Sequence, residues 1–253
     1  MTRWIILALT AGLAACAAPP EPGGIHDPLE PANRRVHAFN RGLDAHVVRP
    51  LTSGMGGGGG SGAGGAVLAG IGNFGSNLGQ PGKAVNHLLQ GRPEPAIRTG
   101  LRFLVNTSLG LGGFLDPATA DFALPELDTD FGQTLAVWGV GEGAYLELPV
   151  LGPSTLRDTA GRLVDLVIDP MHAVLNRDEY LIGLGMRAVS KAGDRARFGD
   201  SVDSVLHESA DSYAQTRLIW TQHRRHELGE QGDEIDPYAC LLYTSPSPRD
   251  KRQ

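Results

Sequence analysis

The stretch DPLEPANRRVHAFNRGLDAHVV, residues 27–48, sets the pattern for the whole chain. Its apolar residues recur at the spacing of one helical face; they are Leu29, Ala32, Val36, Phe39, Leu43 and Val47. The opposite face is polar and consists of Asn33, Arg34, His37, Asn40, Arg41 and Asp44. Asp27 and Glu30 have the spacing of a capping box, and Pro28 suits the first turn of a helix. The stretch predicts an amphipathic helix that begins at Asp27 and ends before Pro50.

Similar pieces follow along the chain, separated by glycine and proline. Helical spacing predicts segments over 67–78, 81–89, 93–106, 154–168, 176–198 and 200–230, with a short helix after Asp169-Pro170, and the last segment is the longest. Residues 54–65 are mostly glycine, which costs about 1 kcal/mol per residue in a helix, so we expect a loop there. They match a dinucleotide-binding glycine pattern only trivially, without the strand and helix that such a loop needs.

The middle of the chain has a different character. The apolar, glycine-rich run 109–115 predicts a bend where the backbone comes close to a neighbour. Residues 116–153 lack helical periodicity, and a weak alternation over Tyr145–Leu148 predicts a short strand or hairpin. The predicted fold class is therefore mainly α, a bundle of amphipathic helices with Gly/Pro hinges and one short hairpin.

Amphipathic helices either pack into a core or lie in a membrane interface, and from the sequence alone we expect a core. Arg98 and Arg102 share a helix with Leu101 and Leu104. These arginines either meet lipid phosphates or extend along an ordinary protein surface.

The N-terminus predicts export and lipidation. Arg3 precedes a short apolar run over residues 4–13, and Leu13-Ala14-Ala15-Cys16 reads as a lipobox. We expect residues 1–15 to be a signal peptide and Cys16 to carry the lipid, with Ala17 favouring the outer membrane. Residues 16–26 are rich in proline and glycine and predict a flexible tether.

Composition limits what the remaining chain can be. The net charge of −6 argues against a nucleic-acid partner. No later run reaches the roughly 18 apolar residues of a transmembrane helix. We expect one domain over 27–236. Residues 240–253, which include Cys240, lack helical periodicity and differ from the acidic stretch before them, so we interpret them as a non-native tail.

The sequence contains no recognisable catalytic pattern. His223 with His226, Asp128 with Asp130, and Ser154 with Arg157 and Asp158 read as solvated, turn or capping residues, so we expect no catalysis, metal or cofactor. The alternative is a lipid-anchored envelope hydrolase with an unrecognised site, for which the residues to test are Ser154, Asp158, His172 and His207. A passive tether to the cell wall would need a peptidoglycan-binding domain, of which the sequence gives no sign.

Several short stretches, in order, resemble the VacJ/MlaA lipoprotein family. They cover residues 27–190 and are Asp27-Pro28-Leu29-Glu30 with Asn33-Arg34 and Phe39-Asn40; Asn73-Phe74 with Asn77-Leu78; Val85-Asn86 with Leu89-Gln90-Gly91; Arg102-Phe103 with Asn106-Thr107; Gly110 with Gly112-Gly113-Phe114 and Asp116; Asp130-Phe131-Gly132-Gln133-Thr134-Leu135; Trp138-Gly139-Val140-Gly141; Gly143 with Tyr145; and Leu148-Pro149 with Gly152-Pro153-Ser154 and Arg157-Asp158. The glycine-rich run 54–65 departs from the family, which usually has a more ordinary basic and apolar segment there.

The resemblance implies a ring of helices in the inner leaflet of the outer membrane, held by a trimeric outer-membrane porin. Phospholipids that have strayed into the outer leaflet would pass through its amphipathic channel to a periplasmic lipid-carrier protein, without nucleotide and without bond cleavage. Disturbing the segment at Phe39-Asn40 would misgate the channel. The channel and gating candidates are Asn33, Phe39, Asn40, Gly112, Gly113 and Phe114.

Overall fold

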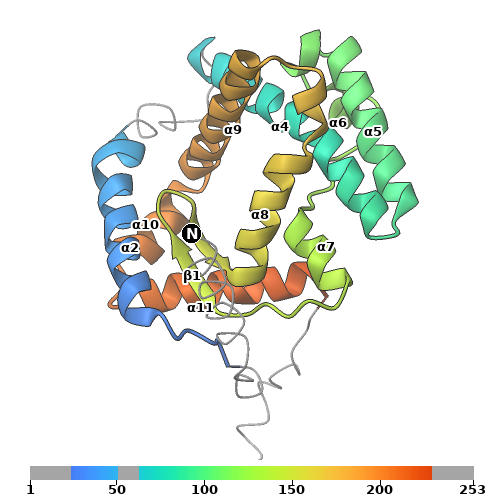
Figure 1. The fold of residues 1–253 in the computed structure, drawn as a ribbon. Helices are drawn as coiled ribbons and strands as arrows, with labels where there is room; N and C mark the ends of the chain where they lie inside the picture. The colour runs from blue at the N-terminus through green and yellow to red at the C-terminus, as the bar shows by residue number, and fades with distance from the viewer. Residues whose placement is uncertain (1–23, 51–62, 230–253) are drawn as a thin grey trace, which may run out of the picture.

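The computed structural model describes residues 24–50 and 63–229 (Figure 1). Within them the chain is mainly helical with one two-stranded sheet, as the sequence predicts. The elements of the first half are α2 (Glu30–Leu43), the π-helical turn η1 (Asp44–Val48), α4 (Ala63–Leu89), α5 (Pro93–Ser108), the 3-10 turn η2 (Leu111–Gly113) and α6 (Pro117–Ala120). Those of the second half are α7 (Phe131–Val137), β1 (Tyr145–Leu148), β2 (Gly152–Thr155), α8 (Leu156–Ile168), η3 (Pro170–Ala173), α9 (Arg177–Arg197), α10 (Gly199–Leu206) and α11 (Ser212–Glu227).

Several predicted segments lie outside these residues. They are the signal peptide 1–15, Cys16 with most of the tether, and the tail 240–253 with Cys240. The predicted glycine-rich loop 54–65 also lies mostly outside, but its last residues, 63–65, already belong to α4.

The described elements follow one another round a closed ring (Figure 1). Starting at the hairpin, β2 contacts α8, α8 packs on α7, and α7 reaches α4. The ring continues because α4 packs along α9, α9 contacts α10, and α11 returns from α10 to β2. Helix α2 contacts β1, whereas α5 packs on α4 away from the centre of the ring (Figure 1). This arrangement agrees with the ring implied by the family resemblance.

The hairpin prediction is confirmed. Strands β1 and β2 are antiparallel, and Tyr145 pairs with Thr155 at one end while Leu148 pairs with Gly152 at the other. Val150 in the turn and Gly152 at the start of β2 both have positive φ, at 68° and 75°. A positive φ is strained for a β-branched residue such as Val150, so the turn must be held by other contacts.

Helix α2 begins later than predicted. Leu29 is its N-cap and makes no side-chain capping bond, so the predicted capping box at Asp27 and Glu30 is wrong. The Asp27 carboxylate instead accepts hydrogen bonds from Asn33, Tyr213 and Arg217. Asp27 therefore joins the start of the domain to α11 rather than starting the helix.

Two predicted helix boundaries are also wrong. The segments 67–78 and 81–89 form one helix, α4, with Pro81 inside it. Packing against both α5 and α9 supports this helix in spite of the proline. Conversely, the predicted helix 200–230 is broken into α10 and α11, because Asp211 accepts a hydrogen bond from the Ala214 N–H and starts a new helix.

Three other predictions are confirmed within a residue or two. Helix α5 begins at Pro93 as expected. Helix α8 is capped by Thr155, one residue after the predicted Ser154. Asn176 and Glu179 form the predicted capping box at the start of α9, where Asn176 N–H donates to the Glu179 carboxylate and Asn176 Oδ1 accepts from Glu179 N–H.

The apolar faces of α2 and α5 are exposed, which contradicts the expected core. On α5, Ile97 and Leu104 are 62% and 61% exposed, whereas Thr99 and Asn106 are buried. On α2, Phe39 is 54% exposed while His37 is 4% exposed. Among the described residues, buried polar or charged side chains outnumber buried apolar ones by more than two to one. Helical periodicity identifies two faces but not which of them is buried, and here the polar face is inside.

A cluster of buried apolar residues lies between α4, η3 and α9. Its buried members are Leu78, Met171 and Tyr180, with Phe74, Leu175 and Leu184 packed around them. No helix among residues 24–50 and 63–229 is long and apolar enough to cross a bilayer.

Candidate functional site

The buried face of α2 holds the free edge of β1. Asn33 donates from Nδ2 to the Tyr145 carbonyl at 3.1 Å and accepts from Glu147 N–H at 3.0 Å. Asn40 repeats this pattern, donating to the Leu148 carbonyl at 2.9 Å and accepting from Val150 N–H at 2.8 Å. Each side-chain amide therefore takes the place of a neighbouring strand, and the second one holds the strained residue of the turn.

Of the three gating candidates on α2, two therefore contact strand β1 and one is exposed on the opposite face of the helix. Asn33 and Asn40 contact β1, whereas Phe39 lies between them in sequence and is exposed on the outer face. The structure therefore does not bring Phe39 and Asn40 together, although they are adjacent in the sequence.

A buried carboxylate completes the contact between α2 and the hairpin. Glu147 accepts hydrogen bonds from the Tyr145 hydroxyl at 2.7 Å and from Asn40 at 3.3 Å, and His37 Nδ1 lies 3.4 Å away. The other nitrogen of His37, Nε2, contacts Ser212 of α11 at 3.0 Å. Burial and the Glu147 carboxylate together raise the pKa of Tyr145, so this hydroxyl stays protonated and acts as a donor.

The other three gating candidates form the predicted bend. Gly112 and Gly113 have φ of 75° and 107°, and a β-carbon on Gly113 would lie within 3 Å of the Asn77 side chain. The Phe114 ring packs on Phe74 of α4 with centroids 4.8 Å apart, and the Phe114 carbonyl accepts from Asn73. The bend is therefore fixed against α4, as the glycine content predicts, while Leu111 on the bend remains 73% exposed.

Arg102 is one of the two arginines considered as binding partners of lipid phosphates, but in the structure it binds other groups of the protein. Its guanidinium donates to the Asp116 carboxylate at 2.8 Å and to the Leu124 carbonyl at 2.7 Å, and the residue is 5% exposed. Arg98 is partly exposed on α5 and pairs with Glu94 one turn away. The prediction that Arg102 lies at a lipid or protein surface is therefore wrong.

A second polar network joins three helices inside the ring. Arg224 of α11 donates to Asp158 of α8 at 3.1 Å and to Asp130, the N-cap of α7, at 2.7 Å. Although burial alone would lower the pKa of Arg224, the two carboxylates raise it. Asp128 and Asp130 are not a carboxylate pair, since Asp128 binds Lys83 instead.

Amide and hydroxyl groups connect α4 to the same region. Asn86 donates to Asp165 of α8 at 2.7 Å and accepts from the Thr134 hydroxyl of α7, which also accepts from Gln90. Burial raises the pKa of Asp165, although Asn86 and the Phe131 N–H lower it. The contacts that join α4, α7, α8 and α11 thus form a hydrogen-bonded framework with several charged members.

The four residues of the hydrolase alternative lie in different surroundings. The hydroxyl of Ser154 contacts the Thr159 hydroxyl at 3.0 Å and the Thr155 carbonyl, neither of which is a base. Asp158 binds Arg224, His172 contacts the Leu166 carbonyl and stacks on Tyr180, and His207 binds Asp44. Within the part of the chain that the structure describes, these residues do not form a nucleophile–base pair.

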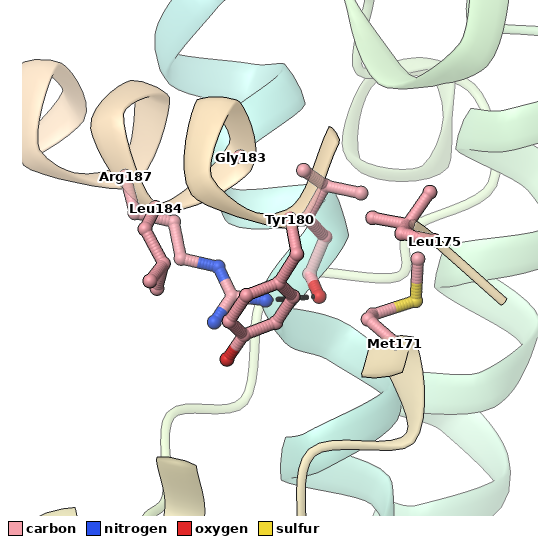
Figure 2. Close-up of a pocket in the computed structure, with 7 residues that line it drawn as sticks. Met171, Leu175, Tyr180, Gly183, Leu184 and Arg187 are labelled. Atoms are coloured by element: carbon pink, nitrogen blue, oxygen red, sulfur yellow. Dashed lines mark hydrogen bonds between the residues drawn. The ribbon is translucent and has the colours of Figure 1, made fainter. Parts of the chain in front are cut away.

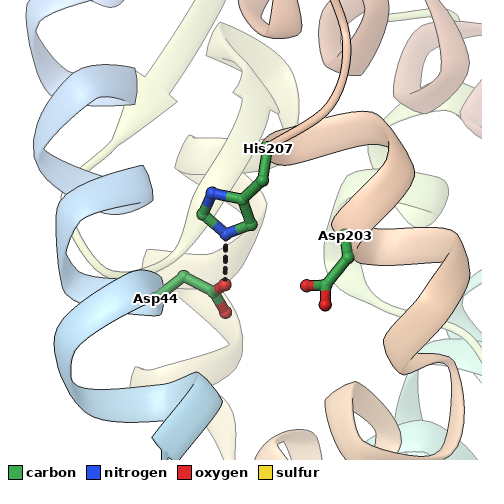
Figure 3. Close-up of side chains that lie close together, drawn as sticks. All are labelled: Asp44, Asp203 and His207. Carbon is green, nitrogen blue, oxygen red and sulfur yellow. Dashed lines mark hydrogen bonds and ion pairs between the residues drawn. The ribbon is translucent and has the colours of Figure 1, made fainter.

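One side-chain cluster has the composition of a metal site. Figure 3 shows that Asp44, Asp203 and His207 lie together, with His207 Nε2 2.9 Å from Asp44. However, Arg195 donates to both carboxylates, at 2.8 Å to Asp44 and 2.5 Å to Asp203. Arg195 pairs with both acids and Arg49 also pairs with Asp203 at 3.0 Å, so the cluster fits an ion-pair network between η1, α9 and α10 rather than a metal site. His223 and His226 are exposed on α11, and His223 pairs with Glu227.

The pocket in Figure 2 belongs to the small apolar region between α4 and α9. It is lined by Leu78, Met171, Leu175, Tyr180, Gly183, Leu184 and Arg187, and it leaves no room for a water-sized sphere. Arg187 closes it by donating to the Leu78 carbonyl and the Asp169 carboxylate. This pocket is a packing seam and cannot hold a lipid tail.

Comparison with known proteins decides the family. The model of the family described as MlaA lipoprotein matches residues 25–227. The chain belongs to the MlaA lipoprotein family. The chain is 35% identical over 234 residues to the intermembrane phospholipid transport system lipoprotein MlaA of Escherichia coli K12, covering 90% of this chain and 88% of that protein. The lipoprotein of the same description from Haemophilus influenzae is 30% identical over 238 residues, covering 90% and 92%.

A solved structure supports the MlaA fold as well. It was reported as a structural basis for maintenance of bacterial outer membrane lipid asymmetry and superposes with a TM-score of 0.66 at 32% identity. The match covers 80% of this chain and 98% of that one. The MlaA resemblance that the short stretches predict is thus confirmed, and the family match extends over residues 25–227.

The residues of the MlaA interior were largely missed by reasoning from the sequence. Glu147, Asp165 and Arg224 were not singled out, because they stand alone among residues without a recognisable pattern. A row of amides on α4 gave a usable signal: Asn73, Asn77 and Gln80 recur at helical spacing. Such a row on a long helix indicates a face that contacts polar protein groups rather than a core.

Proposed function

We propose that this protein is an outer-membrane lipoprotein that removes mislocalised phospholipids from the outer leaflet and passes them to a periplasmic carrier. Membership in the MlaA family supports this, because relatives in that family are described as intermembrane phospholipid transport lipoproteins. One observation of this chain carries the proposal: many large apolar side chains are exposed, whereas polar and charged side chains are buried where the elements of the closed ring meet. A protein surrounded by water would have the reverse distribution.

Acylation of Cys16 would hold the ring at the membrane after removal of residues 1–15. Several acyl chains at about 0.8 kcal/mol per buried methylene make such an anchor permanent. Residues 24–26 already contact the domain, since the His26 carbonyl accepts from Tyr145 N–H and the Gly24 carbonyl accepts from Arg225. The free tether would therefore end before Gly24, and the ring would stay close to the lipid headgroups. Residues 240–253 play no part in this proposal.

The outward apolar side chains would contact acyl chains, while headgroups would pass along the polar interior. No cofactor or bond cleavage is needed, because lipid moves down its free-energy gradient once a path exists. We further propose that a trimeric outer-membrane porin holds the ring and that a periplasmic lipid-carrier protein accepts the phospholipid. The family relationship supports these two partners only through the transport system to which the relatives belong.

The gating candidates fall into two groups that we propose act differently. Asn33 and Asn40 would set the position of the hairpin, whereas Gly112, Gly113 and Phe114 would set the bend against α4. Phe39 would lie against lipid on the outer face. Deleting Phe39 and Asn40 should therefore disturb the hairpin and misgate the channel. Unchanged membrane permeability and lipid distribution after this deletion would contradict the gating role.

The test is the phospholipid content of the outer leaflet in a host that lacks its own family member. The gene, truncated at Ala239, is expressed together with a compatible porin, and a Cys16→Ser variant is the control for anchoring. We expect surface phospholipid to fall with the wild-type gene and to stay high with the variant. If surface phospholipid stays high although the lipidated protein is in the outer membrane, the proposed function is wrong.

A further inference from the structure

Arg162 of α8 differs from four arginines that join elements of the ring. Arg102, Arg187, Arg195 and Arg224 each donate to a carboxylate at 3.2 Å or less. The described contact of Arg162 is a single long hydrogen bond, 3.5 Å from its guanidinium to the Pro153 carbonyl. Arg162 is therefore a cation for which the described part of the chain supplies no carboxylate partner.

The acids that interact with Arg162 electrostatically already accept hydrogen bonds from another arginine. Asp130 and Asp158 lie close enough to raise its pKa, but Arg224 donates to both carboxylates. Surrounding protein also removes water from the Arg162 guanidinium, and this desolvation outweighs the acids and lowers its pKa. Yet the residue is exposed to solvent. A ligand can therefore reach the Arg162 guanidinium from solvent.

Exposed apolar side chains follow Arg162 along the same helix. Leu166 is one turn further on and is 47% exposed, and Leu163 and Val167, which lie together beside this line, are 65% and 78% exposed. Side chains at i and i+4 lie about 6 Å apart. Helix α8 runs along the inner side of the ring, between the hairpin and α7 (Figure 1). Within one turn, α8 thus offers an unpaired cation and an apolar surface.

We propose that Arg162 binds the phosphate of a phospholipid headgroup while an acyl chain lies along Leu166 and its apolar neighbours. A planar guanidinium donates two parallel hydrogen bonds to phosphate, which a lysine ammonium cannot match. This inference rests on the proposed function and names the binding site within it. The same cation would also attract free phosphate, but only a lipid would use the apolar side chains beside it.

The experiment places a photoreactive benzophenone amino acid at position 166 in the full-length, lipidated protein (Leu166→p-benzoylphenylalanine). Cells are labelled with radioactive phosphate and irradiated, and the phospholipid joined to the protein is counted. The measurement is repeated with Arg162→Gln and with Arg162→Lys. Arg98→Gln is the control variant, because Arg98 is a partly exposed arginine on α5 that pairs with Glu94. Leu104→p-benzoylphenylalanine is the control position, because Leu104 faces outward on α5.

We expect Arg162→Gln to reduce cross-linking at position 166 by about tenfold, since a charge-assisted hydrogen bond contributes roughly this factor. Arg162→Lys should restore part of it, Arg98→Gln should change nothing, and cross-linking at position 104 should be independent of Arg162. Equal cross-linking at position 166 with and without Arg162, or none in the wild type, would overturn the proposal. Neither outcome depends on the phospholipid content of the outer leaflet. The binding site and the proposed function are therefore tested by separate measurements.

A second arm separates lipid from free phosphate. Inorganic phosphate alone is added to purified, delipidated protein in a neutral detergent and followed by phosphorus NMR. Line broadening that is lost in Arg162→Gln, combined with no lipid cross-link at position 166, would mean a free-phosphate site and would overturn the lipid assignment. Cross-linking that depends on Arg162 while inorganic phosphate does not compete with it would support the lipid.

Discussion

The carboxylate of Asp158 lies 3.1 Å from the guanidinium of Arg224, and both residues are buried. Asp158 belongs to α8 and Arg224 to α11. This pair therefore joins two helices that both contact strand β2 of the hairpin (Figure 1). Arg224 also binds Asp130, so one side chain neutralises two acids. The ring is therefore held closed largely by charge at this point rather than by apolar packing.

Arg224→Met should be strongly destabilising, because it leaves Asp130 and Asp158 without their cation. We expect a loss of about 3–5 kcal/mol in the free energy of unfolding, measured by urea denaturation in detergent. Arg34→Met is the matched control, since Arg34 pairs with Asp211 at an exposed site, and it should change little. Equal effects of the two substitutions would contradict the role given to the buried pair.

Gly161→Ala should also destabilise the protein, but through close packing. A β-carbon at Gly161 would overlap the backbone of Gly132, where α8 crosses α7. Gly100→Ala on α5 meets nothing within 4 Å and should instead stabilise by up to about 1 kcal/mol, because alanine favours a helix. Thermal unfolding followed by circular dichroism should show melting temperatures that move in opposite directions. If the melting temperature rose equally in Gly161→Ala and Gly100→Ala, α7 and α8 would not approach each other this closely.

Asn40→Ala should release the turn of the hairpin. The Val150 N–H then loses its acceptor, so its hydrogen exchange should become at least about tenfold faster. The N–H of Leu156, which donates to the Ala144 carbonyl, serves as the internal reference and should keep its rate. If Val150 exchanges at the wild-type rate, the turn is not held by Asn40.

Leu104→Asp should leave the fold intact but weaken membrane binding. Leu104 is 61% exposed, so a charge there disturbs no core, whereas the lost apolar contact and the added charge weaken binding to vesicles by at least about tenfold. The measurement is flotation with phospholipid vesicles, using a Cys16→Ser background so that the acyl anchor does not mask the effect. Thr99→Asp, at a buried position of the same helix, should unfold the protein instead. A folded Thr99→Asp variant together with an unfolded Leu104→Asp variant would reverse the assignment of the two faces.

Stability should fall in acid through Asp116. Burial tends to raise the pKa of this carboxyl, but hydrogen bonds from Arg102, Thr119 and Asn106 outweigh burial and hold its pKa below the usual value. A depressed pKa in the folded state contributes stability at pH values above about 4, where the unfolded carboxyl is ionised, and this contribution is lost as the pH falls through the folded pKa. Asp116→Asn should lower stability at neutral pH and flatten the dependence of the unfolding midpoint below about pH 4. An unaltered acid profile in this variant would exclude Asp116 as the titrating group.

The sequence predicted the helices better than it predicted their surroundings. The alternation of faces on α2 and α5 was visible, but amphipathic spacing is the same whether the outer solvent is water or lipid. The expectation of a core followed from assuming water, and the exposed Ile97 and Phe39 show the opposite. The resemblance to a membrane family supplied what periodicity could not.

Helix boundaries were missed where tertiary contacts overrode local preference. Pro81 was expected to start a helix, yet α4 continues through it because two other helices pack along its length. Helix α7 was missed because its seven residues are too few to show a period. The break before α11 depends on Asp211, which binds Arg34 from a distant part of the chain as well as capping the helix.

The way in which Asn33 and Asn40 cover the edge of β1 also bears on export. An uncovered edge strand is a template onto which another chain can add, and a lipoprotein must cross an aqueous compartment at high local concentration before it reaches its membrane. Side-chain amides cover this edge as soon as α2 docks, without requiring another strand or a partner. The same two asparagines that position the hairpin would thereby protect the protein from aggregation while it is in transit.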